Sequence, residues 1–185
     1  MRIIGGRSRG LHLSPVGEGD SAAHLRPTSD RVREAIFNLL LNGGYGDPVT
    51  GARVLDLFAG TGALGLEAIS RGAAHATLVD DGAAALALQK RNTALMRTDA
   101  ATSLRRNALR LGAVAGAPFT LVFLDPPYGK TMGEQALTSA IEGAWLAPEA
   151  LIVWEESTPP TVPPAFVRLD HRRYGDTLVT ILRAP

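Results

Sequence analysis

The feature that most constrains this chain is an apolar run that ends in a glycine-rich loop, at residues 54–65. Gly60, Gly62 and Gly65 have the spacing G-x-G-x-x-G, and the acidic residue Asp80 follows Gly60 by 20 positions. Glycines in such a loop let the backbone approach a ligand, and the helix that follows begins with free N–H groups. The pattern predicts a strand, a turn and a helix, and it is typical of folds that bind adenosine-containing ligands.

Strand-like and helix-like segments alternate along the rest of the chain. Capping residues, glycines and apolar periodicity predict a helix that follows residue 30 and ends at the glycines 43–44, and another that follows the glycine loop and ends at residue 70. They also predict helices over residues 83–96 and 133–141, and a shorter one at 108–111. Apolar runs predict strands at residues 53–58, 76–79, 102–106, 119–124 and 151–155. Two further runs, 166–171 and 177–182, flank a turn and predict an antiparallel hairpin. We therefore expect an α/β fold with a mainly parallel seven-stranded sheet that ends in this hairpin.

The first part of the chain has a different character. Residues 2–4 and 11–13 flank glycines and carry arginines, which predicts a basic β-hairpin or arm, and residues 15–25 predict a mobile loop. This divides the chain into residues 1–25 and a main domain of residues 26–185. Thr28, Ser29 and Asp30 have side chains suited to cap the first helix. Its apolar face would consist of Val32, Ala35, Ile36, Leu39 and Leu40. Arg31 and Arg33 would then face solvent.

Composition excludes several classes of protein. The chain has 185 residues, enough for one domain with a sizeable core, and no cysteine, which excludes disulfides, thiolate zinc sites and a cysteine nucleophile. Its four histidines show no metal-ligand spacing, so we expect no metal site. No apolar run is long enough to span a membrane and the first residues lack a signal-peptide core, so a cytoplasmic location is expected by default. The net charge of +1 neither favours nor excludes nucleic acid, but arginines cluster before residue 35.

Polar residues follow the ends of several predicted strands. Because the carboxyl ends of parallel strands share one edge, a single ligand site is expected there. The residues concerned are Asp56, Gly60, Asp80, Asn107 and Asp125.

The tetrapeptide Asp125-Pro126-Pro127-Tyr128 follows the most apolar predicted strand. Both prolines fix φ and neither has an N–H group, so the backbone is rigid there. A carboxylate, a backbone carbonyl and an aromatic ring are then presented at the sheet edge. These groups suit an exocyclic amine and the flat face of a base.

Together these motifs resemble a known family. The glycine loop with Asp125-Pro126-Pro127-Tyr128 is similar to S-adenosylmethionine-dependent amino-methyltransferases of the Rossmann-like class I. The segments at residues 2–6, 26–38 and 174–177 resemble the RsmD family more narrowly, over most of the chain. Members of that family methylate N2 of a specific guanine in bacterial 16S ribosomal RNA. The resemblance implies a 16S rRNA substrate in the small ribosomal subunit or its assembly intermediate, and we expect a monomer.

The resemblance also implies roles for residues. The cofactor S-adenosyl-L-methionine would lie against Asp56, Phe58, Ala59, Gly60, Thr61, Gly62, Asp80, Asp81, Asn107 and Asp125. Asp80 would accept the ribose hydroxyls, and Asn107 stands where the family pattern leads one to expect aspartate. The catalytic group would be Asp125, Pro126, Pro127 and Tyr128. RNA phosphates would contact Arg2, Arg7, Arg9, Arg26, Arg31 and Arg33.

The expected reaction is direct in-line methyl transfer to a flipped base. Three alternatives stay open. Asp125-Pro126-Pro127-Tyr128 is shared with DNA adenine-N6 and other nucleic-acid amino-methyltransferases, although this chain has little room for a DNA-recognition domain. The glycine loop with Asp80 also fits an NAD-dependent oxidoreductase. A non-catalytic RNA-binding protein with a cofactor fold is the third.

Overall fold

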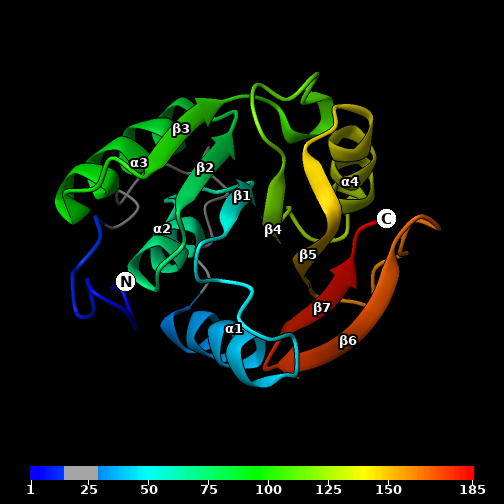
Figure 1. Ribbon diagram of the computed structural model, residues 1–185, viewed down its shortest axis with the longest axis horizontal. Coiled ribbons are helices and arrows are strands. Elements are labelled where there is room, and N and C mark those ends of the chain that lie inside the picture. The colour runs from blue at the N-terminus through cyan, green and yellow to red at the C-terminus, as the bar shows by residue number, and fades with distance from the viewer. Residues whose placement is uncertain (15–28) are drawn as a thin grey trace.

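The computed structural model describes residues 1–14 and 29–185. In this part of the chain, seven strands form one sheet in the order β3-β2-β1-β4-β5-β7-β6 (Figure 1). Strands β1 to β5 pair in parallel, and β7 runs antiparallel between β5 and β6. The strands are β1 (Arg53–Leu57), β2 (His75–Asp80), β3 (Ala101–Arg105), β4 (Phe119–Leu124), β5 (Leu146–Glu156), β6 (Val167–Tyr174) and β7 (Thr177–Arg183).

Helices cover both faces of the sheet. One face is covered by α1 (Asp30–Asn42), α2 (Ala63–Ser70) and α3 (Ala83–Met96), whose apolar side chains share a core cluster with Val54, Phe123 and Val153. The other is covered by α4 (Met132–Glu142) and the 3₁₀ helix η1 (Ala108–Arg110), which pack with Leu55, Val122 and Trp154. The predicted α/β fold, with a mainly parallel sheet and an antiparallel C-terminal hairpin, is therefore confirmed.

Two elements differ from the sequence prediction. Strand β5 begins at Leu146 and not at residue 151, and its pairing with β4 shifts register where Glu149 has φ 58°. Pro148 and this positive φ interrupt the strand pattern, which is why only the second half was predicted. The segment after Asn107 forms a single 3₁₀ turn, capped by the Asn107 side chain.

Helix α1 begins where predicted, with the Ser29 side chain accepting the Val32 N–H. Ile36 and Leu40 are buried as predicted, but the buried face is shifted so that it also includes Arg33 and Phe37. The expectation that Arg33 faces solvent is wrong, because its side chain is fully buried. Arg33 lies on the helix face that also holds Ile36, Phe37 and Leu40, at spacings of three, four and seven residues. The carboxylates of Asp30 and Glu67 compensate its charge.

Residues 1–14 lie against the main domain. A single antiparallel bridge joins Arg2 and His12, so the predicted hairpin forms. Ile3 and Leu13 are buried in the same core cluster as α1 and α2. The predicted mobile loop, Arg26 and the domain boundary at residue 25 lie outside the described residues.

None of the helices in residues 1–14 and 29–185 combines the length and the apolarity needed to cross a membrane. Nor do three or more His, Cys, Asp or Glu side chains of these residues gather in a way that could hold a metal ion.

Candidate functional site

The parallel strands end at one edge of the sheet, which we call the carboxyl edge. Leu57, the last residue of β1, pairs with Val79 of β2 on one side and with Leu124 of β4 on the other. The residues that follow these positions therefore lie close together, as the sequence predicted. They are the glycine loop after β1, Asp80 at the end of β2 and Asp125 after β4.

Two glycines of the loop are required for separate reasons. Gly62 has φ 78°, and a Cβ there would lie 2.7 Å from a methyl carbon of Leu78. Gly65 lies in the first turn of α2, where a Cβ would lie 2.4 Å from the other methyl carbon of Leu78. The positive φ of Gly62 forms the turn, and the absence of a side chain at Gly65 lets α2 pack closely on β2. Helix α2 begins after Gly62, so the positive end of its dipole lies at the carboxyl edge.

Asp80 holds the loop in place from the neighbouring strand. Its Oδ2 accepts the Gly60 N–H at 2.9 Å, and its Oδ1 accepts the Gly82 N–H at 2.9 Å. Its side chain is half-buried at the end of β2. A carboxylate oxygen accepts more than one hydrogen bond, so Asp80 retains capacity for ligand hydroxyls.

Two buried amides on α3 complete the support of the loop. Gln89 Nε2 donates to the Gly60 carbonyl at 3.2 Å, and Asn92 Nδ2 donates to the Thr61 carbonyl at 3.0 Å. Asn92 Oδ1 also accepts the Ser14 N–H at 2.8 Å, which links the loop to the N-terminal segment. Sequence reasoning missed both residues. The available signal was their position on the buried face of α3, between Ala85 and Met96.

Asp56 lies beneath the loop and is fully buried. Its Oδ2 accepts the Gly65 N–H at 2.9 Å, which ties β1 to the start of α2. Burial raises the pKa of Asp56 to about 7, with smaller contributions from the charges of Asp125 and Asp80, against the lowering effect of the Gly65 bond. Three carboxyl groups thus influence one another at the carboxyl edge.

The Asp125-Pro126-Pro127-Tyr128 segment leaves β4 at the same edge. The Asp125 N–H donates to the Leu57 carbonyl at 3.4 Å, so the segment begins beside the glycine loop. Tyr128 is half-buried and shares a side-chain hydrogen bond with Thr177 of β7. Burial, with the nearby Asp125 charge, raises the pKa of Tyr128 to about 12. The phenol is therefore neutral near pH 7, and its ring is a candidate stacking surface.

Two acidic residues at the end of β5 were missed by sequence reasoning. Trp154 pairs with Leu124, so the next residue, Glu155, lies level with Asp125 on the adjacent strand. Glu156 Oε2 accepts N–H groups of Gly129 at 3.4 Å and Ser157 at 3.1 Å, and thereby holds the loop after Tyr128. Burial raises the pKa of Glu156. Two acids directly after a buried apolar run were the available signal.

Asp81 and Asn107 lie near the site with exposed side chains. The Asp81 carbonyl accepts a hydrogen bond from Arg105 Nε at 3.1 Å. Asn107 Oδ1 accepts the Leu109 N–H at 2.8 Å, so this amide serves as the cap of η1. The Asn107 amide group retains its two N–H donors for a ligand.

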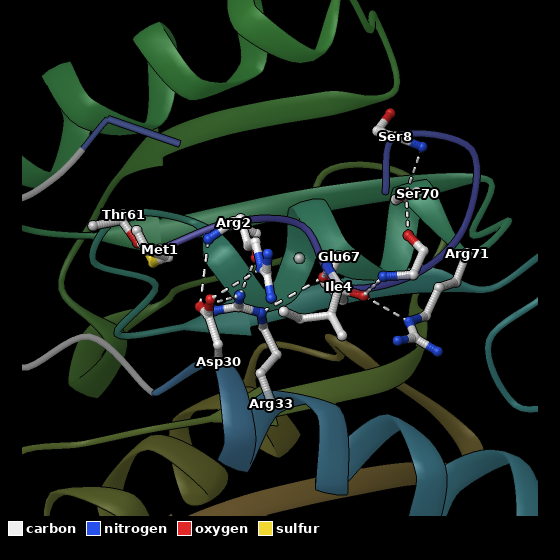
Figure 2. A network of polar contacts seen from close by, with 12 residues as sticks. Met1, Arg2, Ile4, Ser8, Asp30, Arg33, Thr61, Glu67, Ser70 and Arg71 are labelled. Atoms are coloured by element: carbon white, nitrogen blue, oxygen red, sulfur yellow. Dashed lines mark hydrogen bonds and ion pairs between the residues drawn. The ribbon is translucent and has the colours of Figure 1, made fainter. Parts of the chain in front are cut away.

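The buried arginine, Arg33, belongs to a polar network centred on Glu67 of α2 (Figure 2). Glu67 is fully buried, and its two oxygens accept the Ile4 and Gly5 N–H groups, each at 2.8 Å. Arg71 Nε lies 2.7 Å from Glu67, Arg33 Nε lies 3.6 Å from it, and Arg33 also pairs with Asp30 at 2.9 Å. An Arg33 amino group further donates to the Arg2 carbonyl. Arg33 therefore connects α1, α2 and the N-terminal segment in the interior of the protein. Its side chain is not available at the surface to contact RNA phosphates.

The other arginines predicted to bind RNA are distributed over the surface. Arg2, Arg7, Arg9 and Arg31 are exposed. Met1 lies at the glycine loop, where Thr61 Oγ1 is 3.7 Å from its sulfur. Arg7 lies at the other end of α2, where its N–H donates to the Ser70 carbonyl at 2.8 Å. The hairpin therefore carries Arg7 away from the carboxyl edge.

Cavity volume does not identify the carboxyl edge as the functional site. Among the described residues, a hollow of about 620 Å³ lies at the opposite edge of the sheet, lined by residues that include Thr50, Thr120 and Leu151. The carboxyl edge is identified by its convergent polar groups.

Comparison with known proteins gives consistent results. The family model described as "Conserved hypothetical protein 95" matches residues 1–183. "Ribosomal RNA small subunit methyltransferase D" of Escherichia coli is 42% identical over 166 residues, which cover 88% of this chain and 79% of that protein. "Putative rRNA methyltransferase YlbH" of Bacillus subtilis is 35% identical over 190 residues, which cover 99% and 98%.

A solved structure has the same fold over the whole chain. The "Putative methyltransferase yhhF from Escherichia coli" superposes with a TM-score of 0.83 at 35% identity, covering 100% of this chain and 97% of that one. The Rossmann-like class I methyltransferase fold expected from the motifs is thereby confirmed.

Proposed function

Since the chain belongs to the RsmD family, whose model is described as "Conserved hypothetical protein 95", we propose that it transfers a methyl group from S-adenosyl-L-methionine to the exocyclic N2 of a specific guanine of 16S rRNA. The observation that carries the proposal is the meeting of two parts at one edge. A glycine loop supported by Asp80 lies beside Asp125-Pro126-Pro127-Tyr128, with the Asp125 N–H bonded to Leu57.

The described residues fit the cofactor. Asp80, half-buried at the end of β2, would accept the ribose hydroxyls, and the positive end of the α2 dipole suits the negative carboxylate of the methionine part. Residues 58–62 would line that part, and Asp81 and Asn107 would lie near the adenine. When bound, the cofactor supplies a methyl group on a positively charged sulfur.

The protein's own task is to orient a weak nucleophile. The lone pair of the guanine amine is delocalised into the ring, so alignment supplies much of the rate. Asp125 and the Pro126 carbonyl would accept the two amine hydrogens, and the rigid prolines keep these acceptors fixed. The Tyr128 ring would stack on the flipped base, and its hydroxyl is already held by Thr177.

The exposed arginines would contact RNA phosphates. Arg2, Arg7, Arg9 and Arg31 are available on the surface, and binding through them should weaken as salt rises. The names of the relatives support a substrate in the small ribosomal subunit. We propose a particle, either the subunit or its assembly intermediate, as the form that is methylated.

Methyl transfer into small-subunit particles from cells that lack this enzyme tests the proposal. Radiolabelled cofactor should place one methyl group on N2 of a single guanine, which mapping of the modified base identifies. Methylation of adenine, or none, would overturn it. Calorimetry should show binding of S-adenosyl-L-methionine and none of NAD, and the reverse result would favour an oxidoreductase.

A further inference from the structure

The tip of the N-terminal hairpin is held rigidly at the C-terminal end of α2. The Arg7 N–H donates to the Ser70 carbonyl at 2.8 Å, and the Ser8 N–H donates to Ser70 Oγ at 3.0 Å. Gly6 has φ 75°, and a Cβ there would lie 1.9 Å from the Ser70 carbonyl oxygen, so this contact depends on glycine. The arginines of the tip, Arg7 and Arg9, are thereby kept in a fixed place.

That place adjoins the C-terminal half of α3. Arg7 Nη2 donates to Thr98 Oγ1, just after α3, at 3.4 Å. The sequence of α3 contains no acidic residue, and Lys90, Arg91 and the following Arg97 are exposed. Arg97 is the C-cap residue of α3 and directly precedes Thr98, the residue that Arg7 contacts. Cations from two separate segments therefore meet on one surface.

The surface also offers an apolar floor. A shallow hollow of about 530 Å³ is lined by Leu11 of the hairpin and by Arg91, Ala94, Leu95 and Arg97. Leu95 is 44% exposed and contributes apolar surface to this hollow. Guanidinium groups around an apolar floor suit a nucleotide, because phosphates pair with arginine and a base packs on the floor.

The surface lies to one side of the reaction centre. Its hairpin part, with Arg7 and Arg9, lies at the Ser70 end of α2, and the eight residues of this helix separate it by about 12 Å from the glycine loop at the Ala63 end. Its α3 part is the exposed side of the helix whose buried residues Gln89 and Asn92 contact the glycine loop. Asp125 is farther still, because β1 lies between β2 and β4. RNA that contacts the surface is therefore not the nucleotide whose base is at Asp125.

We propose that Arg7, Arg9, Lys90, Arg91 and Arg97, with Leu11 and Leu95, form a second RNA-docking surface, which we call the distal basic surface. It binds phosphates of an RNA segment separate from the target guanine, with an unstacked base against the leucines. It fixes the particle on the enzyme and does not take part in methyl transfer. The proposal rests on the proposed function for the identity of the RNA.

The double substitution Arg91→Gln/Arg97→Gln tests it in the full-length protein. With small-subunit particles as substrate, KM should rise about tenfold while kcat is retained. The slope of log affinity against log salt should become less steep by about 1.5, since each lost phosphate contact contributes about 0.7–0.9. The matched control is Arg168→Gln/Arg183→Gln, which removes the same charge from exposed positions of β6 and β7 and should leave both quantities unchanged.

Equal KM and salt slope in the two double variants would overturn the proposal while leaving the proposed function intact. Failure of the proposed function shows itself differently, as absent methyl transfer by the unsubstituted enzyme. Binding to protein-free 16S rRNA identifies the partner. A loss of affinity for this RNA supports RNA docking, whereas a loss confined to the particle assigns the surface to a ribosomal protein and overturns the proposal.

Discussion

The two loops that meet at the carboxyl edge are held in different ways. The glycine loop is fixed by hydrogen bonds of 2.9 to 3.2 Å. Asp80 accepts one of them, and Gln89 and Asn92 each donate one. The loop that begins at Asp125 has longer contacts, 3.4 Å from the Asp125 N–H to Leu57 and 3.4 Å from the Gly129 N–H to Glu156. Its rigidity comes from the rings of Pro126 and Pro127, which restrict φ covalently.

Because of this difference, we expect substitutions that disturb the glycine loop to affect mainly stability, and substitutions in the loop after Asp125 to affect mainly activity. The side chains that fix the glycine loop are buried and connect it to α3 and the N-terminal segment, so disturbing that side should cost folding energy. The backbone of the loop after Asp125 is stiffened by its proline rings, so side chains there should be replaceable at the expense of activity. Substitutions on each side test the separation.

Glu67→Ala should have the largest effect on stability. It leaves the Ile4 and Gly5 N–H groups unpaired and two arginines without their buried carboxylate. Breaking a buried ion pair costs about 3–5 kcal/mol, so the free energy of unfolding in urea should fall by that amount. The exposed Glu142→Ala is the control, with a change within about 0.5 kcal/mol. Similar urea midpoints for the two variants would show that the network is dispensable.

Asp125→Ala should have the largest effect on chemistry. Removing one preorganised hydrogen-bonding group from a reaction centre costs about 10²–10³ in kcat, or about 2.7–4 kcal/mol. Radiolabelled methyl transfer measures the loss, and calorimetry should show that cofactor binding persists. Asp125→Asn keeps one acceptor oxygen and should lose less. Unchanged transfer by Asp125→Ala would remove Asp125 from the reaction.

Asn92→Ala tests the connection between the glycine loop and the rest of the protein. It leaves the Thr61 carbonyl and the Ser14 N–H without this partner, at a cost of about 1–3 kcal/mol. Cofactor affinity should fall about 5- to 30-fold with kcat little changed, because the loop loses its fixed position. Asn92→Asp retains the acceptor for Ser14 but cannot donate to Thr61. A loss of stability without any change in cofactor affinity would argue for a purely structural amide.

Asp56 lies between the two loops, and its substitution should be seen as a pH dependence of stability, with a small change within any one pH unit. Its pKa is about 7 in the folded protein against an ordinary aspartate value of 3.8, so the folded state retains a proton that the unfolded state releases. Stability therefore falls as pH rises from about 4 to about 7, at a slope below about 1.4 kcal/mol per unit. Asp56→Asn removes this term and retains an acceptor for Gly65. The stability of this variant relative to the original should rise over that range and then level off. A difference that stays constant with pH would contradict the raised pKa.

Much of the site was predictable because its residues are placed by local rules. Gly62, Asp80 and Asp125 stand at the ends of apolar strands, and parallel strands bring such ends to one edge. Gln89 and Asn92 were not predicted, because their role depends on carbonyl groups 29 and 31 residues away. A helix pattern shows that such positions are buried but not what they face.

Arg33 shows most clearly what could not be predicted from the sequence. Its place among charged neighbours favoured a surface role, yet Glu67, 34 positions away in the chain, lies within ion-pair distance of its buried guanidinium. The order of strands and helices, the turn at Gly62 and the rigid segment after β4 could be predicted from the sequence, because they follow from apolar periodicity, glycine and proline. Tertiary structure alone decided which charges are buried and which segments they join. A charge can be buried only where folding brings an opposite charge close to it, and the local sequence around Arg33 or Glu67 does not indicate its partner.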